Sequence, residues 1–132
     1  MLSKTITYVD FDGEKREETF MFNISRAEMV RMETSINGGL TTLLKRIIAE
    51  NDTPKIMEYF EKFIREAIGR KSFDGKRFEK SEEIANEFFQ SEAWSELLME
   101  LINVPNAASD FVNATLGQVD SDKPTSIPQI NG

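Results

Sequence analysis

The chain contains no cysteine and no histidine. Without cysteine it can form neither a disulfide nor a thiolate nucleophile, and it offers no cysteine ligands to a metal ion. Without histidine it lacks the commonest general base and metal ligand at neutral pH, so most familiar hydrolase arrangements are excluded. Carboxylates, lysine and tyrosine remain, but none of them occurs in a recognisable catalytic spacing. We therefore expect no enzyme activity, no catalytic residues, no cofactor and no metal ion.

Long apolar runs are also missing from the sequence. No stretch reaches eighteen apolar residues, and the chain does not begin with a charged segment followed by an apolar one. We therefore expect neither a membrane span nor a secretory signal, and the expected compartment is the cytoplasm. Hydrophobic residues make up 39% of the 132 positions and charged residues 30%. This balance is typical of a globular domain large enough to bury a core.

Positive charge is scarce toward the end of the chain. Residues 1–80 hold 15 Lys and Arg against 14 Asp and Glu, whereas residues 81–132 hold one basic residue against nine acidic ones. The formal net charge of −7 argues against general nucleic-acid binding, because phosphate contacts need a basic face. Within the first part, residues 65–80 hold six basic residues against three acidic ones. Such asymmetry can orient a partner or a second copy of the chain, although solvated surface charge is an equal alternative.

The tripeptide Phe-Asp-Gly occurs twice, at 11–13 and at 73–75, and Asp-Gly allows the positive φ of a tight turn. The first copy lies between two segments rich in β-branched and aromatic residues, so it predicts an N-terminal β-hairpin over 4–23. One face of this hairpin is apolar and should pack on helices. The members of that face are Ile6, Tyr8, Phe20, Phe22 and Ile24.

Helix signals follow the hairpin. Helices are predicted at about 25–35, 40–51, 54–68, 81–89, 91–104 and 106–116. Ser25 and Glu28 form a capping box, Thr53 is predicted as the N-cap of the third helix with Pro54 at its first helical position, and Gly69 is expected to end it. Further N-caps are predicted at Ser81, Ser91 and Asn106. The predicted fold is α+β and mostly α, with the hairpin packed on a bundle of about five to six helices. We expect one globular domain at 1–116 and a flexible, disordered tail at 117–132.

The second Phe-Asp-Gly lies in a segment, 70–80, that lacks helical periodicity. This segment is predicted to be an ordered loop or short hairpin anchored by Phe73 and Phe78. Lys76 and Arg77 flank an exposed turn, so they are either solvated charge or a docking contact. The same two alternatives apply to a row of glutamates at i, i+4 spacing on helix 91–104, where Trp94 begins the buried apolar stripe.

The charge and turn arguments together select a set of candidate partner-binding residues. They are the basic and aromatic residues of the 70–80 segment and the glutamate row. The candidates are Arg70, Lys71, Phe73, Lys76, Arg77, Phe78, Glu92, Glu96 and Glu100. A basic segment of one copy facing the acidic helix of a neighbour would give a salt-sensitive, head-to-tail contact.

Several segments, taken in order, resemble one known family. They are YVDFDG at 8–13, TFMFNIS at 19–25 followed by Ala27 and Glu28, GGL at 38–40, GRKSFDGKRF at 69–78 and EAWSELLMEL at 92–101. In this order, over about residues 4–116, the chain is similar to the tail assembly chaperones of long-tailed, siphovirus-type bacteriophages and related prophages. No position among them is a catalytic signature.

The resemblance implies a non-enzymatic protein of the infected bacterial cytoplasm that is absent from the mature virion. Members of this family coat the tape measure protein, keep it soluble and help to recruit tail tube subunits. A ribosomal frameshift often yields a longer form that contacts the tube protein, and the present chain would be the short form. Self-association is expected, and neither nucleic acid nor a membrane is an expected partner. The alternative is a small acidic phage or host regulatory protein that binds and inhibits an enzyme.

Overall fold

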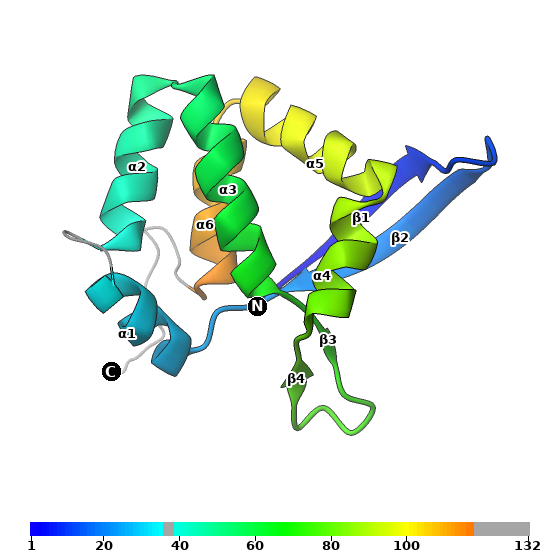
Figure 1. Ribbon diagram of the computed structural model, residues 1–132, viewed down its shortest axis with the longest axis horizontal. Helices are drawn as coiled ribbons and strands as arrows, with labels where there is room; N and C mark the ends of the chain where they lie inside the picture. The colour runs from blue at the N-terminus through cyan, green and yellow to red at the C-terminus, as the bar shows by residue number, and fades with distance from the viewer. Residues whose placement is uncertain (36–38, 118–132) are drawn as a thin grey trace.

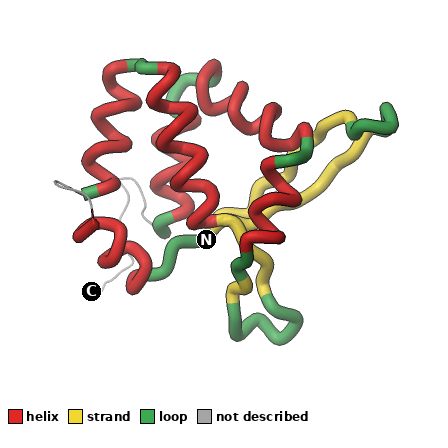
Figure 2. Tube along the Cα trace, in the orientation of Figure 1, coloured by secondary structure: helices red, strands yellow, loops and turns green. Residues whose placement is uncertain are grey.

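A computed structural model describes residues 1–35 and 39–117 of the chain. The strands are β1 (Leu2–Val9), β2 (Lys15–Phe22), β3 (Ile68–Lys71) and β4 (Phe78–Glu79). The helices are α1 (Arg26–Ser35), α2 (Leu40–Glu50), α3 (Thr53–Ala67), α4 (Glu82–Phe89), α5 (Glu92–Asn103) and α6 (Ala107–Thr115). The predicted α+β, mostly helical class is confirmed (Figures 1 and 2). Apart from Gly117, the predicted tail lies outside the described residues.

The strands form one antiparallel sheet in the order β1-β2-β3-β4. The register of the first hairpin pairs Leu2 with Phe22 and Val9 with Lys15. Because side chains alternate along a strand, this register places the predicted apolar residues on one face. Figure 1 shows the far end of this hairpin projecting beyond the helices. Toward the turn, Ile6 and Tyr8 of β1 remain buried in the core, whereas the first five residues of β2 are exposed.

Asp10 organises the turn between β1 and β2. Its carboxylate accepts hydrogen bonds from the backbone N–H groups of Asp12 and Glu14, both at 2.9 Å, and from the Arg16 guanidinium at 2.7 Å. The hydrogen bond from Arg16 and those from the backbone lower the pKa of Asp10. Gly13 supplies the positive φ, at 83°. The Asp-Gly signal therefore predicts this turn correctly.

Aromatic side chains join the first hairpin to the helices. Phe88 of α4 lies at the centre, with its ring 4.9 Å from Phe20, 5.9 Å from Phe22 and 6.1 Å from Trp94 between centroids. Phe22 also meets Phe111 of α6 at 5.0 Å. These contacts are edge-to-face, which is a favoured geometry for aromatic rings. Trp94 is partly buried against the core, as the apolar stripe predicts.

Local signals place most helix ends correctly. The capping box is present, since Ser25 Oγ accepts from Glu28 N–H at 3.1 Å and Glu28 accepts from Ser25 N–H at 2.8 Å. Ser81 and Ser91 also cap their helices through their hydroxyl groups. Asn106 occupies the position before α6, but it adopts a left-handed conformation and its side chain makes no capping hydrogen bond.

Two predicted ends of α3 are wrong. The N-cap is Asp52 rather than Thr53, because the Asp52 carboxylate accepts from Lys55 N–H at 3.2 Å and Thr53 is already helical. Gly69 does not cap the other end. The chain leaves α3 at Ile68 in an extended conformation and runs directly into β3, where Gly69 pairs with Met21. The helix therefore turns into a sheet strand without a glycine cap.

Candidate functional site

The β3–β4 hairpin extends away from the helices (Figure 1). Arg70 pairs with Glu79 and Lys71 pairs with Phe78 in its antiparallel ladder. Of the two alternatives predicted for 70–80, the structure adopts the short hairpin. It carries all four basic candidate residues, and all four are exposed.

Ser72 and Asp74 hold the tip of this hairpin in one conformation. Ser72 is buried, donates its hydroxyl hydrogen to Asp74 at 2.7 Å and accepts from Arg77 N–H at 2.9 Å. The Asp74 carboxylate also accepts from Lys76 N–H at 3.0 Å, while Gly75 takes a φ of 77°. Hydrogen bonds from the Lys76 backbone and the Ser72 hydroxyl lower the pKa of Asp74. The tip is thus pre-organised by its own side chains.

Phe73 is fully exposed at this tip, with a relative exposure of 109%. The prediction that it anchors the loop is therefore wrong. The small hydroxyl of Ser72 takes the inward position and ties the turn together by hydrogen bonds, so the next side chain points to solvent. Phe78 is partly buried and does pack at the base of the hairpin. A Cβ added to Gly69 would lie 2.5 Å from the Phe78 ring, so this close packing depends on the glycine.

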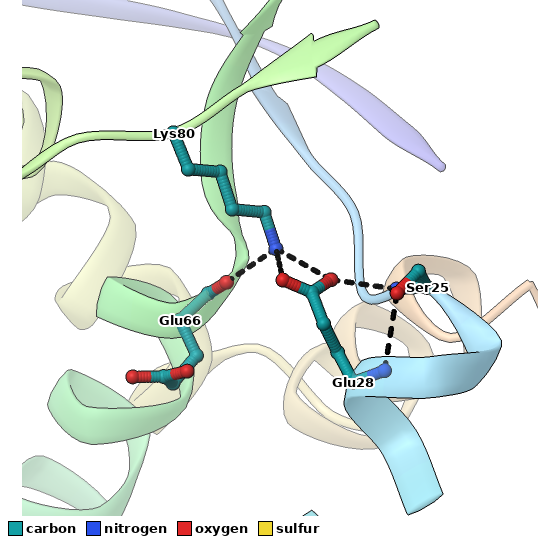
Figure 3. A network of polar contacts seen from close by, with 4 residues as sticks. All are labelled: Ser25, Glu28, Glu66 and Lys80. Atoms are coloured by element: carbon teal, nitrogen blue, oxygen red, sulfur yellow. Dashed lines mark hydrogen bonds and ion pairs between the residues drawn. The ribbon is translucent and has the colours of Figure 1, made fainter. Parts of the chain in front are cut away.

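A polar network fixes the base of the hairpin (Figure 3). Lys80, which follows β4, donates to both carboxylate oxygens of Glu28 and to the Glu66 carbonyl. Glu28 in turn closes the capping box with Ser25. Burial alone would raise the pKa of Glu28, but the hydrogen bonds from Lys80 and Ser25 outweigh it and lower that pKa. The hairpin is therefore tied to α1 and α3.

The basic candidates differ in how far their charge is neutralised within the chain. Arg70 pairs with Glu87 of α4, and Arg77 pairs with Glu79 at 2.8 Å. Lys71 and Lys76 are exposed and form no ion pair with the described residues. These two lysines flank Phe73 on either side in sequence.

The glutamate row lies on α5. Glu92 accepts from the Ser95 hydroxyl at 3.0 Å, and Glu100 forms an ion pair with Lys4 of β1 at 2.7 Å. Glu96 is exposed and has no ion pair within the described residues. Figure 1 shows α5 far from the β3–β4 hairpin, on the other side of α4. The structure therefore does not bring the basic and acidic candidates together within one copy.

Sequence reasoning missed several exposed apolar side chains. Phe11 at the tip of the first hairpin has a relative exposure of 77%, and Met99 and Val104 near the glutamate row are about half exposed. The repeated Phe-Asp-Gly was the available signal for Phe11, since both copies place phenylalanine at a turn. Helical periodicity was the available signal for Met99, since the apolar stripe of α5 runs through Leu97, Leu98 and Leu101 and leaves Met99 off it.

Other site types find little support in the residues that the structure describes. No group of three or more Asp or Glu there could hold a metal ion. None of the described helices is long and apolar enough to cross a membrane. The described surface offers a projecting aromatic tip, exposed lysines and a glutamate without an ion pair to the described residues, and grooves between elements.

Residues 1–118 match the family described as phage tail assembly chaperone. The chain belongs to this family. Searches of curated proteins and of solved structures found no significant match. The family match agrees with the resemblance seen in the ordered sequence segments. Membership of the phage tail assembly chaperones places the chain's partners among tail-assembly proteins.

Proposed function

We propose that this chain is a non-enzymatic chaperone that binds the tape measure protein and helps to recruit tail tube subunits during tail assembly. The observation that carries the proposal is the family match, which covers 118 of 132 residues. The protein acts in the cytoplasm of the bacterial host and does not remain in the finished virion. The gene is expected to contain a slippery heptamer near its end, with an overlapping frame that encodes the longer, tube-binding form.

A groove between α1 and α3 supports binding of a helical substrate. Its volume is about 380 Å³, and Met32, Leu40, Tyr59 and Phe63 supply apolar atoms to its lining. Arg31, Lys62 and Glu66 lie around these side chains. An apolar groove with charged residues at its rim suits the apolar face of an amphipathic helix, and a tape measure protein is long and helical. In this proposal, a short helical stretch of the tape measure protein occupies the groove.

Affinity capture from phage-producing cells tests this proposal. The tagged chain should recover a very long helical tail protein. Recovery of a polymerase or nuclease instead would support the alternative of an acidic enzyme inhibitor. Mass spectrometry of purified virions should not detect the chain, because a chaperone leaves before assembly ends.

Two matched variants of α3 test the groove itself. Tyr59→Ala removes a partly buried ring from the groove lining, whereas Met57→Ala removes an exposed side chain of the same helix outside the groove. We expect Tyr59→Ala to lower recovery of the tape measure protein and Met57→Ala to leave it unchanged. Equal recovery by both variants would place the tape measure protein elsewhere on the surface.

A further inference from the structure

One edge of β2 is open over most of its length. β3 pairs only with Met21 and Phe22 of β2 and then turns away to pair with β4. Lys15–Thr19 is exposed, with β1 on one side and no strand of the described chain on the other. Figure 1 shows the two hairpins diverging from their shared base. The sheet therefore has an unpaired edge beside the first part of β2.

A hydrogen bond at the end of β2 shows which backbone groups face this open edge. Asn23 N–H donates to the Ala67 carbonyl, on the β3 side, at 2.8 Å. Because this direction alternates from residue to residue in an antiparallel ladder, odd-numbered residues of β2 face the β3 side and even-numbered ones face β1. The backbone groups of Lys15, Glu17 and Thr19 therefore point to the open edge. They have no hydrogen-bond partner among the described residues.

The usual protection of an edge strand is incomplete here. Edge strands in native sheets are commonly short, bulged, covered by other elements or interrupted by proline. β2 is eight residues long, contains no proline and pairs with β1 in an unbroken register. Charged side chains also protect edges, but in β2 they occupy positions 15–18 and stop before Thr19. The edge at Thr19 thus remains available to a partner strand.

A pocket adjoins this edge at the point where β2 and β3 separate. Its volume is about 400 Å³, and four consecutive β2 residues, 18–21, contribute to its lining. Since side chains alternate between the two faces of a strand, a pocket lined by consecutive residues lies at the edge of the strand. Ile84 and Phe88 of α4 add apolar atoms to those of Phe20 and Met21. The pocket is therefore placed to receive an apolar side chain from a strand that pairs with Thr19.

Lys71 supplies a positive charge to this pocket. Two other charged groups of the lining are already paired with each other, since Arg70 contacts Glu87. Glu18 accepts a hydrogen bond from the Tyr8 hydroxyl. Lys71 is exposed and forms no ion pair with the described residues. A carboxylate is therefore the charged group that the pocket can accept without breaking an existing contact.

We propose that the open edge of β2 binds an extended peptide segment of a partner protein, which adds a strand beside Lys15–Thr19. Its backbone pairs with Glu17 and Thr19, an apolar side chain enters the pocket, and a neighbouring carboxylate pairs with Lys71. In this mode of recognition the main-chain hydrogen bonds supply affinity and the pocket supplies specificity. The segment is a strand rather than a helix, so this site is distinct from the α1–α3 groove of the proposed function.

Peptides selected from a random library for binding to the purified wild-type chain serve as the probe. We expect the selected peptides to carry apolar residues at alternating positions, with Asp or Glu beside one of them. Two proline variants then locate the binding site. Thr19→Pro removes an N–H from the open edge of β2, and Thr5→Pro removes one from the outer edge of β1. Both lose the same Thr5–Thr19 hydroxyl contact, and proline is tolerated where the N–H faces away from the ladder.

The variants should differ in affinity for the selected peptides. Thr19→Pro should raise the dissociation constant by about tenfold, because a main-chain hydrogen bond is lost, whereas Thr5→Pro should leave it unchanged. Lys71→Glu should raise it by about fivefold. Lys76→Glu reverses the charge of another exposed lysine in the same hairpin, which does not line the pocket, and should have no effect. Circular dichroism checks that each variant is folded.

Amide hydrogen exchange of the wild-type chain gives a measurement that needs no variant. Exchange at Glu17 and Thr19 should slow when a selected peptide binds, because their N–H groups gain partners. Exchange at Glu18 and Phe20 should change little, since their N–H groups already face β1. This alternation is specific to an added strand.

Several results would overturn the proposal. They are a selection that recovers no peptide, selected peptides that bind Thr19→Pro as tightly as the wild type, and a bound peptide that leaves exchange at Glu17 and Thr19 unchanged. Equal losses for Thr19→Pro and Thr5→Pro would also contradict it, and self-association abolished by Thr19→Pro would assign the edge to a second copy instead. These measurements use the chain and synthetic peptides, so their failure is distinct from failure to capture the tape measure protein.

Discussion

Lys80 donates hydrogen bonds to both carboxylate oxygens of Glu28, at 2.8 and 2.9 Å, although 52 positions separate them in sequence. The same ammonium group donates to the Glu66 carbonyl at 2.6 Å, in the last turn of α3. A cation at a helix C-terminus and a carboxylate at a helix N-terminus are both favourable placements. One lysine therefore connects the start of α1, the end of α3 and the base of the projecting hairpin.

Two substitutions of Glu28 separate its two roles. Glu28→Gln keeps an oxygen that can accept from Ser25 N–H but removes the charge that pairs with Lys80. We expect it to lower the free energy of unfolding by about 0.5–1 kcal/mol. Glu28→Ala removes both interactions, and we expect a loss of about 1–2 kcal/mol. Urea unfolding of the wild type and both variants measures the two losses of unfolding free energy. Equal losses would show that the charge contributes nothing beyond the cap.

The lowered pKa of Glu28 makes stability depend on pH. Because the folded-state pKa lies below the ordinary value of 4.5, the carboxylate stabilises the fold at pH values above 4.5. This contribution is lost as pH falls through the folded-state pKa, where Glu28 is protonated in both states. The difference in unfolding free energy between wild type and Glu28→Gln should therefore be largest near neutral pH and shrink in acid. A difference that stays constant between neutral pH and pH values well below 4.5 would contradict this account.

Gly69 is predicted to tolerate no side chain. A Cβ there would lie 2.5 Å from the Phe78 ring and 2.6 Å from the Glu79 carbonyl oxygen, so Gly69→Ala must displace β4. We expect the free energy of unfolding to fall by about 1–3 kcal/mol, as for other overpacked sites. Amide hydrogen exchange in residues 68–79 should become faster. Gly75→Asn is the matched control in the same hairpin, since a Cβ there meets nothing within 4 Å and asparagine tolerates its positive φ. Unchanged exchange in Gly69→Ala would mean that the hairpin base is loosely packed.

Thr115 carries a buried hydroxyl that has no hydrogen-bond partner among the described residues. Replacing that hydroxyl with a methyl group of similar shape removes an unsatisfied polar group from the core. Thr115→Val should therefore stabilise the fold by about 1 kcal/mol, whereas Thr115→Ala leaves a small cavity and should gain less or lose stability. Thermal unfolding compares the two. A lower melting temperature for Thr115→Val than for wild type would show that the hydroxyl is satisfied in solution.

The sequence predicts the parts of this fold that depend on near neighbours. Asp-Gly at 12–13 marks the first turn, and the Ser25–Glu28 box marks the start of α1, because both involve residues a few positions apart. The prediction of Thr53 as the N-cap of α3 was wrong, since the preceding Asp52 is an equally good cap and only the backbone geometry decides between them.

The site was less predictable because it depends on contacts between distant segments. Whether Ser72 or Phe73 faces inward depends on hydrogen bonds within the turn, which composition alone does not determine. The packing of Gly69 against Phe78 and the reach of Lys80 to Glu28 likewise depend on how β4 folds back on β3. The sequence identifies the charged candidates. It does not reveal that α4 lies between the basic residues of the β3–β4 hairpin and the glutamates of α5.

Solubility of the tape measure protein, measured with and without this chain in the same cells, tests the central claim most directly. The proposal predicts that the tape measure protein is largely insoluble when expressed alone. When co-expressed with the chain, it should be found in the soluble fraction and co-purify with several copies of the chain. A tape measure protein whose soluble fraction is the same in both cases, and that does not co-purify, would contradict the proposed chaperone function.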